Sequence, residues 1–154
     1  MVTNKLSVRY EEDFNLWTEQ MVELLRARRF EELDIDNLLD ELESMSKRDK
    51  RELVSRLKLI LMHLLKWNYQ PDQRGASWET TIRNNREEIA QILQDSPSLK
   101  IYTATILEQA YASARKNAAS ETGTLIDDFP ENCPFAIAEV LNEDFLPAEI
   151  IGNS

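Results

Sequence analysis

The sequence predicts an all-α fold, a single antiparallel bundle of about four principal helices followed by a short C-terminal helix. The 154 residues contain only three glycines, and helix-favouring Leu, Glu, Ala and Arg are abundant. Apolar residues recur with the period of a helix in four successive segments that short turns separate. A chain of this length buries enough apolar surface for one core. We therefore expect one domain over residues 1–154, with a structured core over about 10–147.

The first predicted helix begins near Tyr10 and ends near Arg28 or Arg29. Its apolar residues lie within about a third of a turn of one another around the helix axis, and they are Tyr10, Phe14, Trp17, Met21, Leu24 and Leu25. This spacing predicts an amphipathic helix. The acidic segment Glu31–Asp34 is predicted to be a short linker to the next helix.

The longest periodic segment runs from about Asp36 to Trp67, and it predicts a nearly continuous helix. A kink between Ser44 and Lys50 is the alternative. One stripe contains the apolar residues Ile35, Leu38, Leu39, Leu42, Leu53, Leu57, Ile60, Leu64 and Trp67, and Ser46 and Asp49 interrupt this stripe at its middle. The part from Leu57 to Trp67 is apolar nearly all round, which predicts a central helix that the others surround.

Start and stop signals define the remaining helices. The turn Gln70–Gly75 contains a proline and a glycine, and Ser77 is predicted to cap the third helix. Ser96-Pro97 predicts the start of a fourth helix, which ends at Gly123 because glycine readily adopts the left-handed conformation that follows a helix. A short last helix is predicted from Pro134 to about Asn142.

The composition disfavours several classes of protein. A net charge of −10 disfavours nucleic acid as a partner, because that binding depends on cations that release counterions. A basic patch at Lys47–Lys58 is the feature that would overturn this view. No apolar run reaches the length of a membrane-spanning helix, and the N-terminus lacks the apolar region of a signal peptide. With one cysteine, Cys133, and no internal disulfide, we expect a soluble cytoplasmic protein.

Residues 63–78 contain the only histidine and two of the three tryptophans. Arginine stacks on aromatic rings and binds anions through two parallel hydrogen bonds, so this segment predicts a binding surface. The candidate binding residues are His63, Lys66, Trp67, Arg74, Trp78, Arg83 and Arg86. The alternative is that the arginines brace the corner between two helices by pairing with acids such as Glu79 or Glu87.

No catalytic residue, metal site or cofactor is predicted. A lone His63 excludes a site built from several histidines, and Asp36, Asp40 and Glu43 on one helix face are typical of a solvated surface. Cys133 has no basic residue close in sequence that would lower its pKa. Glycine-rich phosphate loops and nucleophile elbows are absent. The sequence therefore leans away from an enzyme without excluding one.

The charges along the long helix suggest self-association. Residues 31–43 carry seven acids and no base, whereas Lys47–Lys58 is predominantly basic. Two copies that cross antiparallel near Ser46 and Asp49 pair acid with base, which suggests a homodimer through the helix Asp36–Trp67. Pairs within one chain, such as Glu43 with Lys47, are the alternative.

Several separated motifs resemble a bacterial family, number twenty-nine among the domains of unknown function. They are His63–Trp67, Gln70-Pro71, Arg74, Ser77-Trp78, Arg83, Arg86, Pro97–Leu99, Tyr111, Ala114-Arg115, Ala119, Glu121, Pro130 and Cys133-Pro134. The resemblance covers about Tyr10 to Pro147 and departs from the family pattern at Asn85, where glutamine is expected. It implies an all-α domain with no assigned activity and no established site residues.

Together these observations favour a non-enzymatic protein-protein interaction or regulatory module. The sequence does not name the protein partner. The alternative is a protein or enzyme that binds a small anionic ligand at the corner formed by His63, Trp67, Arg74 and Trp78.

Overall fold

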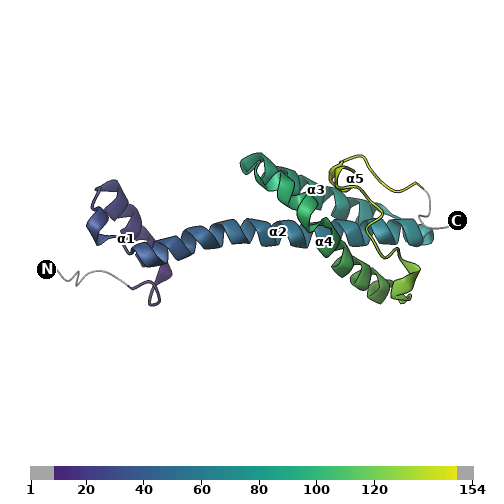
Figure 1. The fold of residues 1–154 in the computed structure, drawn as a ribbon, viewed down its shortest axis with the longest axis horizontal. Helices are drawn as coiled ribbons and strands as arrows, with labels where there is room; N and C mark the ends of the chain where they lie inside the picture. The colour runs from purple at the N-terminus through teal and green to yellow at the C-terminus, as the bar shows by residue number, and fades with distance from the viewer. Residues whose placement is uncertain (1–8, 149–154) are drawn as a thin grey trace. The chain divides into compact units, whose positions relative to one another are not determined.

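The computed structural model describes residues 9–148 and contains only helices and turns in that range. The helices are α1 (Phe14–Arg26), α2 (Ile35–Tyr69), α3 (Ala76–Asp95), α4 (Leu99–Thr122) and α5 (Ile137–Leu141). Three 3-10 turns connect them, η1 (Phe30–Glu32), η2 (Pro71–Gln73) and η3 (Ile126–Asp128) (Figure 1). The predicted all-α helical bundle is confirmed.

The chain divides into two compact units between Lys47 and Arg48. The first unit contains α1, η1 and the start of α2, and the second contains the rest of α2 with α3, α4 and α5. We call these the first unit and the second unit. The expectation of one domain over residues 1–154 stays a prediction.

The first unit has a small core fastened by side-chain hydrogen bonds. Trp17, Met21 and Leu24 are buried, and the Trp17 indole donates to the Asp34 carboxylate at 3.0 Å. Asp34 also accepts from the Asn37 side chain at 2.7 Å. The hydrogen bonds from Asn37 and Trp17 lower the pKa of Asp34, although its burial opposes this shift. The start of α2 is thereby held against α1.

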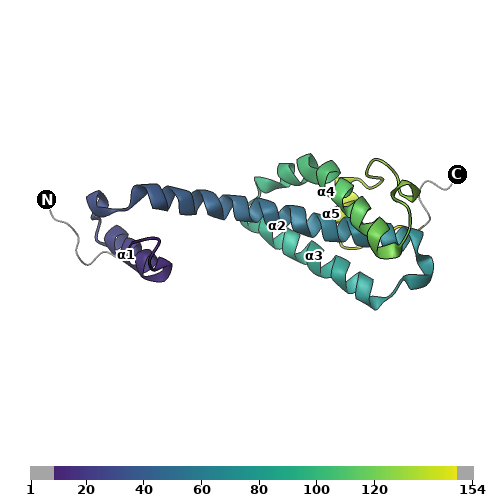
Figure 2. The same ribbon diagram turned by 90° about the horizontal axis from the view of Figure 1, so that it is seen from below.

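The second half of α2 forms the centre of the second unit, as predicted. Its fully buried side chains are Leu53, Leu57, Ile60, Leu61, Leu64 and Leu65. Figures 1 and 2 both show α3 and α4 running beside this half of the helix. The fully buried Ala110, Ala114 and Ala118 of α4 belong to the same core, and such small side chains permit close approach of helix backbones.

Helix α2 is unbroken from Ile35 to Tyr69, which confirms the nearly continuous helix. Its apolar stripe, however, has two different environments. Leu53 is fully buried, whereas Ile35, Leu39 and Leu42 are exposed, because no described part of the first unit covers them.

Several predicted helix ends need correction. Helix α1 begins at Phe14 rather than at Tyr10, because the Asp13 carboxylate accepts from the Leu16 N–H at 3.0 Å and caps the helix there. Helix α3 begins at Ala76 with Gly75 as its N-cap, so Ser77 lies inside the first turn. Helix α4 also begins later than the predicted Ser96-Pro97.

Ser96 is the C-cap of α3 rather than the cap of α4, and α4 begins after Ser98. The C-terminal end of α4 agrees with prediction, since Gly123 adopts φ 69°. Helix α5 is shorter than the predicted segment, covering Ile137–Leu141.

Candidate functional site

Six of the seven candidate binding residues fall into three groups of contacts, all within the second unit. Lys66 belongs to the first group and is only 8% exposed. Its ammonium lies 3.2 Å from the Glu121 carboxylate of α4 and 4.9 Å from the centre of a Trp78 ring. The charge of Lys66 is therefore already balanced by a carboxylate and an aromatic face.

His63 lies in the same group, with its ring edge-on to Trp78 at 6.4 Å between centroids. Its Nδ1 is 2.8 Å from the carbonyl oxygen of Leu59. A carbonyl only accepts hydrogen bonds, so Nδ1 carries the proton and Nε2 is the basic nitrogen. Burial lowers the pKa of His63, and nearby Lys66 lowers it further, while the Leu59 hydrogen bond and Glu121 oppose the shift.

The lowered pKa predicts that protonation of His63 destabilises the folded protein. The unfolded chain takes up a proton near the ordinary histidine pKa of 6.5, but the folded chain resists it until a lower pH. The neutral imidazole therefore contributes its full stabilisation above pH 6.5. This contribution decreases as the pH falls from 6.5 towards the pKa of His63 in the folded chain. We expect the stability of the natural protein relative to His63→Gln to decrease over that interval.

Urea unfolding midpoints of both proteins across neutral and mildly acidic pH measure this difference. His63 is the only histidine in the chain, so other titrating side chains affect both proteins alike. A difference that stays constant with pH would contradict the prediction.

Arg74 and Trp67 form the second group. The Arg74 Nε donates to the Trp67 carbonyl at 2.6 Å, and the guanidinium lies 5.3 Å from the centre of the Trp67 ring. Trp67 is in the last turn of α2, where carbonyl groups lack partners within the helix. Arg74 therefore caps the C-terminal end of α2 and holds the turn that follows.

Arg86 forms the third group, together with the end of α5. It is 3% exposed, and it donates to the carbonyl oxygens of Val140 at 2.8 Å, Glu139 at 3.3 Å and Glu143 at 3.4 Å. Burial lowers the pKa of Arg86 to about 10, with Asp144 opposing the shift, so the group remains a cation at neutral pH. Arg86 thus binds backbone carbonyls, not Glu79 or Glu87.

Arg83 is exposed and lies beside Arg86 at a small pocket of about 220 Å³. The other residues that line this pocket are Glu79, Ile82, Glu143, Asp144 and Leu146. Three of these are acids, so the pocket is not a simple anion site. Arg74 supports the bracing interpretation at the corner between α2 and α3, although it bonds to a carbonyl and not to an acid. Arg86 instead ties α3 to the end of α5, and ligand binding at this corner stays a prediction.

The described residues offer little for familiar chemistry. Burial raises the pKa of Cys133 to about 11, so the reactive thiolate is scarce at neutral pH. Its Sγ contacts the Phe135 carbonyl at 3.3 Å. Within residues 9–148, no group of three or more His, Cys, Asp or Glu side chains is arranged to hold a metal ion.

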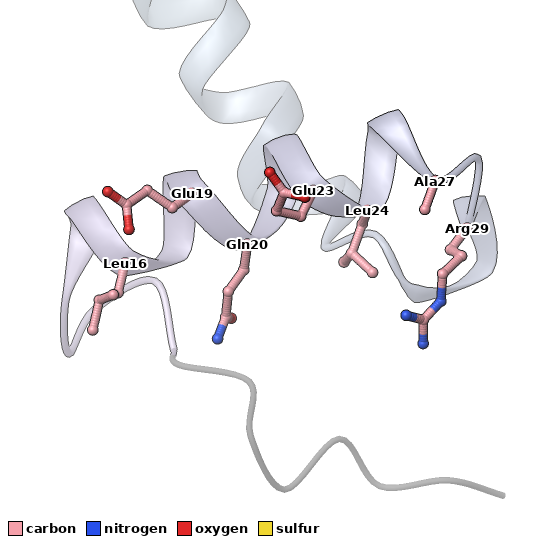
Figure 3. Close-up of a pocket in the computed structure, with 7 residues that line it drawn as sticks. All are labelled: Leu16, Glu19, Gln20, Glu23, Leu24, Ala27 and Arg29. Carbon is pink, nitrogen blue, oxygen red and sulfur yellow. The ribbon is translucent and has the colours of Figure 1, made fainter.

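A larger groove lies in the first unit, along α1, and sequence reasoning missed it. It has a volume of about 410 Å³ and is lined by Leu16, Glu19, Gln20, Glu23, Leu24, Ala27 and Arg29. Figure 3 shows Leu16, Gln20, Leu24 and Arg29 projecting to the same side of the helix. Arg29 is ion-paired with Glu32. The groove is therefore partly apolar and carries the two carboxylates of Glu19 and Glu23.

Exposed apolar side chains are concentrated in the first unit. Among the described residues, the large exposed ones of the second unit are Leu59, Ile101, Leu125 and Ile126. Those of the much shorter first unit are Phe14, Leu16, Val22, Leu25, Phe30, Ile35, Leu39, Leu42 and Met45. For Ile35, Leu39 and Leu42 the signal in the sequence was the apolar stripe of α2, which does not reveal what covers it.

The first unit is also the more acidic part of the chain for its length. Residues 9–47 contain twelve acids and five bases. In α2 the acids Asp36, Asp40 and Glu43 lie among exposed Ile35, Leu39 and Leu42. This surface is therefore apolar and negatively charged at once.

Comparison with known proteins gives a family and no activity. No helix among residues 9–148 is both long and apolar enough to cross a membrane. No curated protein and no solved structure matches the chain. The family described as Domain of unknown function DUF29 matches residues 9–146. The match covers nearly the whole sequence, and the chain belongs to this DUF29 family.

Proposed function

We propose that this chain is a non-enzymatic interaction module whose first unit binds a protein partner through its apolar, acidic surface. The observation that carries the proposal is that far more large apolar side chains are exposed than buried in that unit. Three large apolar side chains form its buried core, Trp17, Met21 and Leu24, whereas nine between Phe14 and Met45 are exposed. A concentration of exposed apolar side chains in one part of a chain is typical of sites where another macromolecule docks.

The energetics favour a partner. Full burial of a leucine or isoleucine side chain is worth about 1.5–3 kcal/mol, and Ile35, Leu39 and Leu42 are each at least half exposed. A partner that covers them recovers part of this free energy for each residue. The first unit therefore gains stability when it is bound.

The alternative function, binding of a small anionic ligand near His63 and Trp78, has less support. Lys66 is paired with Glu121, and Arg74 is bonded to the Trp67 carbonyl. An anion would have to displace these contacts, which lowers its affinity.

A second copy of the chain is one possible protein partner, and it would form a homodimer through α2. The half of the helix from Leu53 onward is largely covered within its own unit. A second copy is thus left with the segment from Ile35 to about Arg51 rather than the whole helix Asp36–Trp67.

Site-specific photo-crosslinking tests the proposal in cells that express the full chain. A benzophenone amino acid is placed at Leu39, and in a matched control at Ile101, which is 80% exposed in the second unit. We expect a discrete crosslinked protein product from position 39 and not from position 101. The product should disappear when Leu42→Ser is added, because this change removes apolar contact area from the same face. Absence of a product at position 39, or equal products at both positions, would contradict the proposed function.

A further inference from the structure

Three residues of α2 form an uncovered seam with the spacing of a coiled coil. Ile35, Leu39 and Leu42 are separated by four and three residues, the pattern by which one helix packs along another. Their side chains are 52%, 51% and 62% exposed. We call these three residues the α2 seam. Its geometry fits a second helix lying along α2 better than it fits a small molecule.

Acidic residues flank the α2 seam. Asp36 and Glu43 each follow a seam residue directly, which places them at the edge of a packed helix pair. Neither carboxylate has an ion-pair partner among residues 9–148. A helix that packs on the seam therefore gains from Lys or Arg at its own flanking positions.

A second copy of this chain does not match the seam in an apolar register. An antiparallel pair that sets Leu39 against Leu42 of the other copy brings Asp36 near Glu43 of that copy. These are like charges, and such contacts are destabilising. A parallel pair brings together two copies of residues 35–47, which each carry four acids and one base.

A register that places opposite charges together loses the apolar contact between the two helices. Sliding the antiparallel pair by one heptad sets Asp36 beside Lys50 of the other copy. The same shift sets Leu39 opposite the charged Asp49, which removes the apolar contact on which a helix pair depends. Crossing the two copies near Ser46 and Asp49 instead sets Leu42 opposite Leu53, which is already fully buried in the second unit. In these registers the chain therefore does not supply an apolar and basic surface that matches its own seam.

We infer that the partner is a basic amphipathic helix of a different protein, with apolar residues that pack on the α2 seam and Lys or Arg beside them facing Asp36 and Glu43. This inference rests on the proposed function and names the chemistry of the partner. Helix-on-helix packing supplies the affinity, and the charges select the partner and its orientation.

Two designed peptides test the inference against the full chain. Both contain three heptads with Leu and Ile at the seam-facing positions, and they differ only in carrying Lys or Glu at the flanking positions. We expect the Lys peptide to bind in fluorescence anisotropy titrations and the Glu peptide to bind at least about tenfold more weakly. Affinity for the Lys peptide should fall as salt rises.

Variants of the chain separate the contribution of the apolar seam from that of the flanking charges. Leu39→Ser with Leu42→Ser should abolish binding, whereas Ile101→Ser, a matched exposed position, should leave it unchanged. Asp36→Asn with Glu43→Gln should weaken binding of the Lys peptide and flatten its salt dependence. Far-UV circular dichroism confirms that each variant is folded.

Equal affinity for the two peptides, or binding that survives loss of the seam leucines, would overturn the inference. A Leu39 crosslink to a second copy, with no binding of the Lys peptide, would also overturn it and would leave the proposed function standing. No crosslink at Leu39 and no peptide binding would remove both.

Discussion

Replacing Arg86 with alanine is expected to destabilise the second unit by about 3 kcal/mol, which is large for a single substitution. The side chain is 3% exposed and donates to the carbonyl oxygens of Glu139, Val140 and Glu143. Truncation removes a buried cation that stabilises the carbonyl end of α5, and it leaves the Val140 carbonyl without this donor. Helix α5 has only five residues, so it depends on such contacts.

Urea unfolding followed by far-UV circular dichroism measures the loss as a lower midpoint. Arg83→Ala is the matched control, because Arg83 is an exposed arginine on the same helix, and we expect a change within about 0.5 kcal/mol. Arg86→Lys should fall between the two, since an ammonium keeps the charge but cannot span three carbonyls with a planar fork. If Arg86→Ala unfolds at nearly the same urea concentration as the natural protein, Arg86 is not the clamp that its contacts indicate.

The central helix could be predicted from the sequence because its composition leaves few choices. A segment such as Leu57–Trp67, apolar nearly all round, has to be surrounded by other elements, and Leu57, Ile60 and Leu64 are fully buried. Gly123 was predictable for a local reason, since few residues other than glycine adopt its backbone conformation without strain.

The environment of the first half of α2 could not be predicted. The spacing of apolar residues indicates which of them share a helix face. The same spacing occurs whether other parts of the chain cover that face or leave it exposed. Ile35 and Leu53 belong to one stripe in the sequence, yet Ile35 is 52% exposed and Leu53 is fully buried. Leu53 is covered because it belongs to the core of the second unit, and membership of a core is a property of the tertiary structure.

The candidate site shows a similar limit. Residues that cluster in the sequence need not act together, because the partner of each is set by the fold. Arg86 bonds to Val140, and Lys66 pairs with Glu121, contacts that span 54 and 55 positions along the chain. The sequence indicated that these cations matter without revealing that the protein itself binds them.

Truncation of the central helix is the second change with a large expected effect. Leu61→Ala is expected to destabilise the second unit by about 3 kcal/mol, within the range for fully buried leucines. Leu61 has no exposed surface and belongs to the core of the second unit. The substitution removes apolar contacts and leaves a cavity that close-packed neighbours fill only in part.

Leu59→Ala provides a control on the same helix, two residues away and with the same change in chemistry. Leu59 is 40% exposed, so its truncation should cost less than about 1 kcal/mol. Urea unfolding midpoints of the two variants compare a core position with a surface position at equal helix propensity. Equal losses would mean that the second half of α2 is not enclosed, and the bracing assigned to Lys66, Arg74 and Arg86 would then have no packed core to support.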